Sequence, residues 1–366
     1  MIRILHVVSS MDRGGIETFI MNVYRNIDRN AIQFDFLVHT ERECAYDKEI
    51  TELGGKIYRV PPRNKGIFTN YQALKKFFHE HKEYLIVHQH VSSLTYITPL
   101  IVSKRFGVPV RIVHGHSTTQ GGNKLNKYLH KLNRKYIKRV VTNRFACSKL
   151  SAKWTFGEVE EQIDIIKNGI DTAAFAYDKK VREYVRRKFG LNGKFVIGHI
   201  GRFNKVKNHS FLIKIFSEIT KQKPSSVLIL IGEGKEKKEI QKEAAELNIE
   251  DKVLFLSPTN NVKDFYQAMD VFVFPSLNEG LGIVLLEAQA SGLVSYASKH
   301  RVPEEVNVTK NVNFIELEKG PYIWAKEIIN SHKNRQSFIK QIDQKGYGIK
   351  EVSNYLQEFY SGRYRR

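Results

Sequence analysis

Cysteine is scarce in this chain of 366 residues, which has only Cys44 and Cys147 and no C-x-x-C pair. This argues against a disulfide framework or a cysteine-built zinc site, and it favours a reducing compartment. With 24 glycines and 9 prolines, the chain also lacks the composition of a fibrous or low-complexity protein. We therefore expect an ordinary globular protein.

Long apolar runs are missing as well. No run approaches the roughly 18–20 residues of a membrane-spanning helix. The first segment, MIRILHVVSS, turns polar too soon for a signal peptide. These features predict a cytoplasmic location and leave open attraction to a membrane surface.

Acidic residues are few relative to basic ones. The chain holds 38 Asp and Glu against 59 Lys and Arg, a formal net charge of +21. Such a charge attracts nucleic acid, anionic lipid or phosphorylated small molecules. No compact nucleic-acid-binding motif or basic-aromatic platform accompanies the charge, so nucleic acid is not the expected partner.

Short β-branched runs alternate with helix-length polar stretches throughout the chain. In the first half, strands are predicted at 2–8, 34–39, 56–60, 85–90, 111–116 and 144–148, and helices at 16–27, 71–81 and 124–138. After the charged stretch 178–194, strands are predicted at 195–200, 227–232, 253–256, 271–275 and 294–297, and helices at 208–221, 235–247 and 283–291. The alternation indicates βαβ units and parallel sheets covered on both faces.

The length of the chain exceeds the roughly 250–300 residues that one hydrophobic core supports. We expect two doubly wound α/β domains facing each other across a cleft, with ligands at the carboxyl ends of the strands. The domains are placed at 1–175 and 190–348, with a hinge near 168–190. The tail, 321–361, is expected to be helical throughout.

The segment 271–292 carries the strongest functional signal. Glu279 lies in a glycine loop after a buried strand, and Glu287 interrupts the apolar helix that follows. Gly280 and Gly282 allow close approach of the backbone to a ligand, and a helix start offers free N–H groups to an anion. Glu287 alone is equally compatible with a capping or ion-pairing role, but two glutamates around a glycine loop favour a ligand site.

Two cations follow the strand at 195–200. Arg202 and Lys207 lie in the loop before the next helix. A planar guanidinium and a point charge together suit a diphosphate, whereas either cation alone could be a solvated surface charge. In the first half, Gly14 and Gly15 form a strand-to-helix turn whose amides could face a phosphate or an acceptor, or serve packing only.

Histidines end the predicted strand 111–116. Alternation puts His114 and His116 on one face of this strand, and His88 and His90 repeat the pattern on the strand before it. The pair suits hydrogen bonds to a sugar hydroxyl. A zinc pair and a structural role are the alternatives, but the segment has no matching Cys or carboxylate ligands.

Two motifs of nucleotide chemistry are absent. The chain has no D-x-D pair and no G-x-x-x-x-G-K-[ST] loop. We therefore predict neither a magnesium site nor a P-loop. No metal and no cofactor is expected.

A basic helix is predicted at 123–139. Its apolar stripe consists of Leu125, Leu129, Leu132 and Tyr136. The basic residues around this stripe are Lys124, Lys127, Lys131, Arg134, Lys135, Lys138 and Arg139. The stripe indicates either a core-facing helix with a solvated basic side or a surface that sits on anionic lipid.

These segments together resemble glycosyltransferase family 4, the retaining enzymes of GT-B fold. The resemblance rests on GGIETF, GRFNKVKNH, LILIGEGKEKKEIQ and PSLNEGLGIVLLEAQASG, which contains the family's signature of two glutamates separated by seven residues. The segment SKHRVPEEVNVTKNVNFIEL is similar to the branch found in bacterial capsular and exopolysaccharide clusters. The final helix, about 349–366, would then cross back to the first domain.

The resemblance implies roles for the residues above. Glu287 would bind ribose hydroxyls, Glu279 would contact the donor sugar, and Arg202 with Lys207 would hold the diphosphate. The further donor-binding residues implied are Gly15, Ser257, Gly280, Leu281, Gly282, Ile283 and Val284. His116 is favoured over His114 for contact with the donor sugar, because a hydroxyl residue follows it.

The implied activity is that of a retaining, metal-independent hexosyl- or N-acetylhexosaminyltransferase. A nucleotide-diphosphate sugar, with UDP favoured, would donate to a hydroxyl of a growing glycan that is lipid-linked and lies at an anionic membrane. The first domain would bind the acceptor and the second the nucleotide sugar. A GT-B nucleotide-sugar epimerase is the main alternative, and its acid/base carboxylates cannot be identified in the sequence. A nucleic-acid-binding protein is the weaker one.

Overall fold

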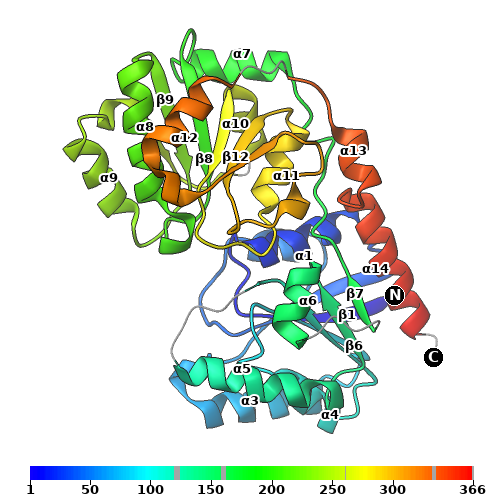
Figure 1. Cartoon of the computed structure of the whole chain (residues 1–366). Helices are drawn as coiled ribbons and strands as arrows, with labels where there is room; N and C mark the ends of the chain where they lie inside the picture. Colours follow the sequence, from blue (N-terminus) through cyan, green and yellow to red (C-terminus); the bar gives the residue numbers. More distant parts are fainter. Residues whose placement is uncertain (119–123, 158–161, 260, 332–334, 365–366) are drawn as a thin grey trace. The chain divides into compact units, whose positions relative to one another are not determined.

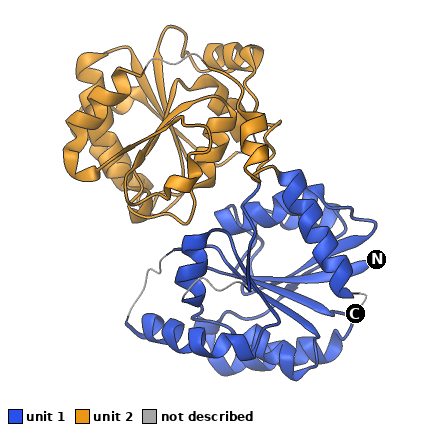
Figure 2. Cartoon of the chain, turned by 45° about the vertical axis from the view of Figure 1, so that its right-hand side comes forward, with its two compact units in different colours: residues 1–169, 349–366 blue, residues 170–348 orange. Residues whose placement is uncertain are grey.

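The computed structural model describes residues 1–118, 124–157, 162–259, 261–331 and 335–364. The chain forms two compact units, which are coloured separately in Figure 2. Unit 1 contains Met1–Gly169 and Ile349–Arg366, and unit 2 contains Ile170–Gly348. No helix in the described ranges combines the length and the apolarity that a membrane span requires.

Unit 1 is built on a parallel sheet of seven strands in the order β3-β2-β1-β4-β5-β6-β7 (Figure 1). The strands are β1 Ile2–Val8, β2 Ile32–Val38, β3 Ile57–Arg59, β4 Ile86–Val91, β5 Val110–Gly115, β6 Asn143–Ala146 and β7 Ile163–Ile165. The helices are α1 Gly15–Asn26, α2 Asp47–Glu52, α3 Ile67–Glu80, α4 Thr98–Arg105, α5 Lys124–Tyr136, α6 Lys149–Phe156 and α14 Ile349–Tyr364. Core residues of α1 and α14 lie on one face of the sheet, and those of α3, α4 and α6 lie on the other.

Unit 2 has a parallel sheet of six strands in the order β10-β9-β8-β11-β12-β13. The strands are β8 Phe195–Ile200, β9 Ser226–Ile231, β10 Val253–Leu256, β11 Val271–Phe274, β12 Val294–Ser298 and β13 Val312–Ile315. The helices are α7 Lys179–Lys188, α8 His209–Gln222, α9 Lys237–Glu246, α10 Val262–Ala268, α11 Ile283–Ala290, α12 Gly320–Ile329 and α13 Ile339–Gln344. The prediction of two doubly wound sheets is confirmed.

The prediction of a continuously helical tail is wrong. The chain from 320 onward forms α12, α13 and α14, and the described residues 330–331, 335–338 and 345–348 between these helices are not helical. Residues 332–334 of the predicted tail lie outside the described residues. Gly346, at a φ of 74°, ends α13 in the left-handed region that favours glycine. Gly348 then pairs with Ile170 as an isolated parallel bridge, and this pairing cannot coexist with a helix.

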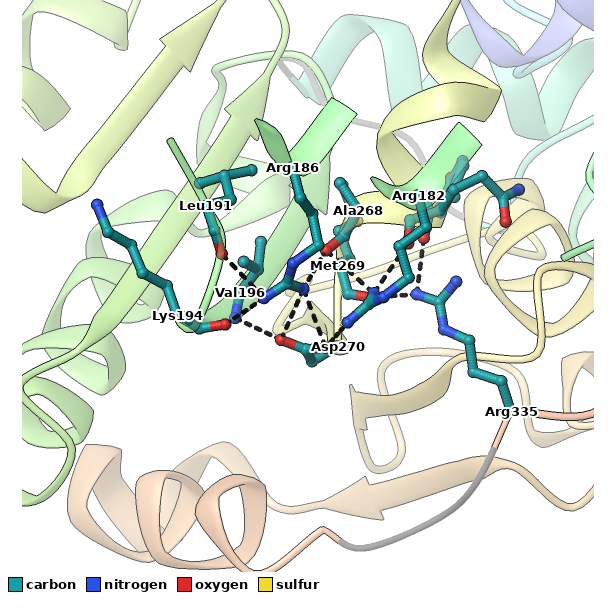
Figure 3. Close-up of polar contacts among 11 residues, drawn as sticks. Arg182, Arg186, Leu191, Lys194, Val196, Ala268, Met269, Asp270 and Arg335 are labelled. Atoms are coloured by element: carbon teal, nitrogen blue, oxygen red, sulfur yellow. Dashed lines mark hydrogen bonds and ion pairs between the residues drawn. The ribbon is translucent and has the colours of Figure 1, made fainter. Parts of the chain in front are cut away.

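The charged stretch 178–194 is part of unit 2 and contains α7. Arg186 donates to the carbonyl of Ala268 at 2.8 Å, and Arg182 forms an ion pair with Asp270 at 2.5 Å. Figure 3 shows Arg335 converging on the same group of backbone carbonyls. The end of a helix carries partial negative charge, so these guanidinium groups stabilise the C-terminus of α10 and fix α7 against it.

Candidate active site

The predicted residues of unit 2 gather at the carboxyl edge of its sheet. Arg202 follows β8, Ser257 follows β10, and Glu279 follows β11. Arg202 is exposed, and it has no hydrogen-bond partner among the described residues. The strand order β10-β9-β8-β11 therefore presents a free cation near a carboxylate at one edge of a single sheet.

Lys207 and Glu279 form an ion pair. Lys207 lies in the 3₁₀ turn η3 (Lys205–Lys207), and its Nζ lies 2.7 Å from Oε1 of Glu279. The two side chains are only 19% and 13% exposed, and the ammonium lies 4.5 Å from the ring centroid of Phe274. Partial burial makes this pair stronger than a surface ion pair. The resemblance implied different ligand groups for the two residues, and nothing in the sequence indicated their contact.

The glycine loop leads directly into α11. Gly282 is the N-cap of this helix at a φ of 86°, where a side chain would be strained, and no side chain caps the first turn. The amides of Ile283 and Val284 therefore keep their hydrogen-bonding capacity, together with the positive end of the helix dipole. This arrangement suits an anion.

Glu287 is buried on α11 and meets a partner that sequence reasoning missed. The hydroxyl of Tyr266 donates to Oε2 of Glu287 at 2.8 Å. Burial raises the pKa of Glu287 to about 7, and the hydrogen bond from Tyr266 opposes this rise. Nothing in the spacing of the two residues, on α10 and α11, predicts their contact.

A smaller polar group lies beside this edge. The hydroxyl of Ser257 donates to Glu233 at 3.0 Å, and Glu233 pairs with Lys237 at 2.7 Å. On β8, the strand that precedes Arg202, Nδ1 of the buried His199 donates to the carbonyl of Val273 at 2.8 Å.

In unit 1, Gly15 begins α1 after β1. Gly14 is an extended N-cap without a side-chain cap, and open space surrounds Gly15 where a Cβ would stand. The first amides of α1 are therefore accessible to an oxygen ligand.

Five histidines form one cluster in unit 1, which we call the histidine cluster; four of them are buried and His116 is partly buried. It consists of His6 on β1, His88 and His90 on β4, and His114 and His116 at the end of β5. The register explains it, because parallel pairing sets His6 beside His88 and His90 beside His114. The rings of His114 and His116 lie 4.0 Å apart, so the predicted common face is present. Two H-x-H motifs on neighbouring predicted strands were the available signal, but the part played by His6 was not visible.

The distances within the histidine cluster can be compared with those of a zinc site, the alternative considered for His114 and His116. Two sets of three rings, His6, His88 and His90, and His90, His114 and His116, bring their nitrogens within 4.8 Å of one another. The further donors come from β1 and β4 and lie outside the segment around His114, in which no matching ligand is present. However, His90 lies 2.9 Å from both His6 and His116. That is hydrogen-bond distance, shorter than the roughly 3.3 Å between two nitrogens on a tetrahedral zinc with bonds of about 2.0 Å.

A cavity opens at the carboxyl edge of the unit 1 sheet. Its volume is about 190 Å³. Among its lining residues are Glu17, His39, Gln89, His90 and Tyr96. The Oε1 atom of Gln89 and the Nε2 atom of His39 are buried without a hydrogen-bond partner. A hydroxyl-rich ligand would supply what these atoms lack.

The apolar stripe of α5 does not face the core. Leu125 is 60% exposed, Leu132 50% and Tyr136 44%, whereas Leu129 is half-buried. Tyr128, at 63%, extends the exposed surface. We call these exposed residues and their basic neighbours the α5 face. Residue 123 of the predicted helix lies outside the described residues.

Comparison with known proteins identifies the family. A model described as Glycosyltransferase Family 4 matches residues 13–174, and one described as Glycosyl transferases group 1 matches residues 181–345. EpsF of Bacillus subtilis, named as a glycosyltransferase, is 33% identical over 371 residues, covering 98% of this chain and 96% of EpsF.

Two further relatives add detail. An Escherichia coli α-1,3-galactosyltransferase, named for UDP-Gal and α-D-GlcNAc-diphosphoundecaprenol, is 29% identical over 63% of this chain and 60% of its own length. The crystal structure of Anabaena Alr3699/HepE with UDP and glucose matches with a TM-score of 0.75 at 18% identity, covering 99% of this chain and 95% of HepE. The chain therefore belongs to glycosyltransferase family 4 and has its GT-B fold.

Proposed function

We propose that this protein is a retaining glycosyltransferase that moves a sugar from UDP to a hydroxyl of a growing, lipid-linked bacterial surface glycan. The observation that carries the proposal is the carboxyl edge of unit 2, where Arg202, the Lys207–Glu279 pair and the uncapped start of α11 follow the neighbouring strands β8 and β11. HepE, which has been crystallised with UDP and glucose, supports UDP as the nucleotide. The lipid-diphosphate acceptor in the name of the Escherichia coli relative supports the acceptor class.

The roles of the residues are assigned by chemistry. Arg202, Lys207 and the amides of residues 282–284 bind the diphosphate, Glu287 binds ribose hydroxyls, and Glu279 binds the donor sugar. In unit 1, His116 contacts the donor sugar, with His114 as the reserve candidate, and the amides at Gly15 face the substrate. Ser257 lies near the base, and the cavity beside His90 takes the acceptor.

The reaction depends on charge stabilisation at the leaving diphosphate. Preorganised cations and helix amides act on negative charge as it develops, and they need no rearrangement during the reaction. We assign no carboxylate as a covalent nucleophile. The acceptor hydroxyl attacks on the face of the departing phosphate, which takes its proton.

A donor screen tests the proposal. Release of nucleotide is measured with a panel of nucleotide sugars, with and without lipid-linked acceptor. A UDP-sugar should give release that requires the acceptor. Conversion of the sugar without an acceptor would identify an epimerase instead, and no release from any donor would contradict the proposal.

The two glutamates should separate in a binding experiment. Glu287→Ala should weaken UDP binding about ten- to a hundredfold, because the ribose hydroxyls lose the buried carboxyl group that accepts their hydrogen bonds. Glu279→Ala should leave UDP affinity close to that of the unmodified protein, because Glu279 serves the sugar. Calorimetry with UDP measures both, and Glu287→Gln, which keeps the shape of the side chain, should lose less. Equal losses in the two alanine variants would contradict the assignment.

The α5 face should bind anionic membranes. Exposed apolar side chains beside clustered lysines match an interfacial helix, and each basic residue contributes about 1 kcal/mol near an anionic surface. Purified protein should sediment with vesicles that contain anionic lipid, be released as salt rises, and bind neutral vesicles poorly.

Three variants separate local from global charge. Replacing Lys127, Lys131, Arg134 and Lys138 with Gln should weaken vesicle binding. The matched control replaces four exposed lysines of unit 2, Lys221, Lys235, Lys238 and Lys242, and should have a smaller effect. Leu125→Ser with Leu132→Ser leaves the charge unchanged and should also weaken binding. Equal losses in the two charge variants would mean that only net charge matters.

A further inference from the structure

The chain between β4 and α4 forms one wall of the cavity in unit 1. The described residues 92–96, which we call the wall segment, have no helical or strand structure. The members of the wall segment that line the cavity all carry a hydroxyl group; they are Ser92, Ser93, Thr95 and Tyr96. The shape of this part of the cavity therefore depends on what holds the wall segment in place.

Side chains from four other elements bind the backbone of the wall segment. The carbonyl groups that accept these hydrogen bonds belong to Ser92, Leu94, Thr95 and Tyr96. In the same order, the donors are Trp154 of α6, Asn133 of α5, Arg63 of the 3₁₀ turn η1 (Arg63–Lys65) and Gln89 of β4. The shape of the wall segment thus depends on hydrogen bonds from distant parts of the chain.

Helix α5 binds both backbone groups of Leu94, which is fully buried. Nδ1 of His130 accepts from the amide of Leu94 at 3.0 Å, and Nδ2 of Asn133 donates to its carbonyl at 2.6 Å. Nε2 of His130 donates to the carbonyl of Trp154 at 3.2 Å. Because a backbone amide can only donate and a carbonyl can only accept, these contacts fix His130 as the neutral ring with its proton on Nε2.

The two sides of α5 have different surroundings. His130 is 2% exposed, and Asn133, three residues further along the same side, is partly buried. Leu132, a member of the α5 face, lies on the opposite side of the helix and is 50% exposed. No residue of α5, all of which the structure describes, belongs to the hydrophobic core of unit 1. Polar contacts such as those with Leu94 therefore attach this helix.

We propose that His130 and Asn133 are positioning residues for the glycan acceptor: they hold the wall segment in the shape that lines the cavity, and they couple it to the α5 face. A buried amide that loses its acceptor is unfavourable, so the wall segment and α5 move together. A membrane that restrains the α5 face thereby restrains the wall of the cavity. The role of the cavity as the acceptor site rests on the proposed function, whereas the hold on the wall segment does not.

Hydrogen exchange, measured by mass spectrometry on the intact protein, tests the hold without any substrate. The ring of His130 stacks on Trp154 at 4.4 Å, and His130→Phe keeps this stack but removes the acceptor of the Leu94 amide. Peptides that cover residues 92–97 should then exchange about tenfold faster, the change for one lost hydrogen bond. Asn133→Ala should act in the same direction. His130→Asn, which keeps an acceptor oxygen near the position of Nδ1, should restore most of the protection.

A matched control is His88→Phe. It also removes a buried imidazole from unit 1, but Nδ1 of His88 pairs with the hydroxyl of Tyr360 at 2.7 Å, away from the wall segment. Exchange of residues 92–97 should stay close to that of the unmodified protein. Equal exchange in the folded His130→Phe and His88→Phe proteins would overturn the hold on the wall segment.

Kinetics test the positioning role once the screen has identified the donor and the acceptor. His130→Phe should raise KM for the acceptor about tenfold and leave KM for the nucleotide sugar unchanged, because only the acceptor is assigned to the cavity. His130→Asn should restore most of the acceptor KM. An unchanged KM for the acceptor, or an equal rise in both KM values, would overturn the positioning role. Absence of nucleotide release by the unmodified protein would contradict the proposed function, and hydrogen exchange would still decide the hold on the wall segment.

Vesicles test the coupling to the α5 face. Vesicles of phosphatidylcholine and phosphatidylglycerol should slow the exchange of residues 92–97 in the unmodified protein, and vesicles of phosphatidylcholine alone should not. The slowing should be lost when His130→Phe and Asn133→Ala are combined, because α5 then no longer holds Leu94. Vesicle binding without slower exchange, or absence of binding, would overturn the coupling.

Discussion

Acidification from about pH 7.5 to about pH 5.5 should unfold unit 1 before unit 2. The five rings of the histidine cluster are held neutral by burial, which lowers each pKa well below the ordinary value of 6.5. In the unfolded chain the same rings bind protons near pH 6.5. The unfolded state therefore binds more protons as the pH falls below 6.5, and the free energy of unfolding decreases.

The size of this effect follows from the number of rings. Each buried neutral histidine lowers the free energy of unfolding by about 1.4 kcal/mol per pH unit below 6.5. Five such rings therefore lower it by about 7 kcal/mol at pH 5.5. A domain is typically stable by only about 5–15 kcal/mol. The loss is therefore large enough to unfold unit 1 while most carboxylates are still ionised.

Unit 2 responds differently. Only His199 and His209 have similarly lowered pKa values among its described residues. Glu287 acts in the opposite direction, because its pKa is raised to about 7 and its folded form gains a proton as the pH falls. Stability gained through Glu287 between about pH 7 and its unfolded pKa of about 4.5 offsets much of the loss at the two histidines.

The two tryptophans report on the units separately. Trp154 lies in unit 1 and Trp324 in unit 2, so Trp324→Phe and Trp154→Phe each leave one fluorophore. The fluorescence transition of Trp154 should come at higher pH than that of Trp324. His88→Phe should shift only the transition of unit 1, toward lower pH. Coincident transitions, or earlier unfolding of unit 2, would contradict the argument.

Loss of either cation at the edge of unit 2 should reduce turnover by about two orders of magnitude. Removal of one preorganised donor from a developing negative charge costs about 2.7–4 kcal/mol of transition-state stabilisation. Arg202→Ala is the cleaner change, because Arg202 is exposed and its removal leaves no buried group unpaired. Arg202→Lys keeps the charge but not the planar fork, and should recover only part of the activity.

Lys207 needs a second variant, because its removal leaves Glu279 without its 2.7 Å partner. Lys207→Met together with Glu279→Gln removes both charges and controls for loss of stability. Single-turnover release of nucleotide measures the rate, and circular dichroism verifies folding. A folded Arg202→Ala or Lys207→Ala enzyme with the unmodified rate would remove that residue from the site.

Strand positions were readable because buried parallel strands are continuous apolar runs. The ranges 195–200 and 253–256 match β8 and β10 without a shift. The break in the C-terminal tail was not readable, because it depends on the pairing of Gly348 with Ile170, far away in sequence.

In the candidate active site, too, some features could be predicted from the sequence and others could not. Placement of Arg202 and Glu279 at strand ends follows from local pattern, whereas the contact between Tyr266 and Glu287 depends on how two helices pack. The periodicity of the sequence predicted the apolar stripe of α5 but did not indicate whether the stripe faces the core or the solvent. The histidine cluster depends on the register between the three strands β1, β4 and β5. The amino-acid sequence alone does not specify this register.

The bridge between Ile170 and Gly348 has a consequence for recombination. The amide of Ile170 also donates to the carbonyl of Tyr347 at 2.9 Å, so the first and last residues of unit 2 are neighbours. Unit 2 is thus one uninterrupted insertion whose two ends meet, and a single gene segment encodes every residue proposed to bind the nucleotide. Exchange of this segment between relatives needs two junctions that lie side by side and would transfer the proposed nucleotide-binding residues together, leaving the sheet of unit 1 unchanged.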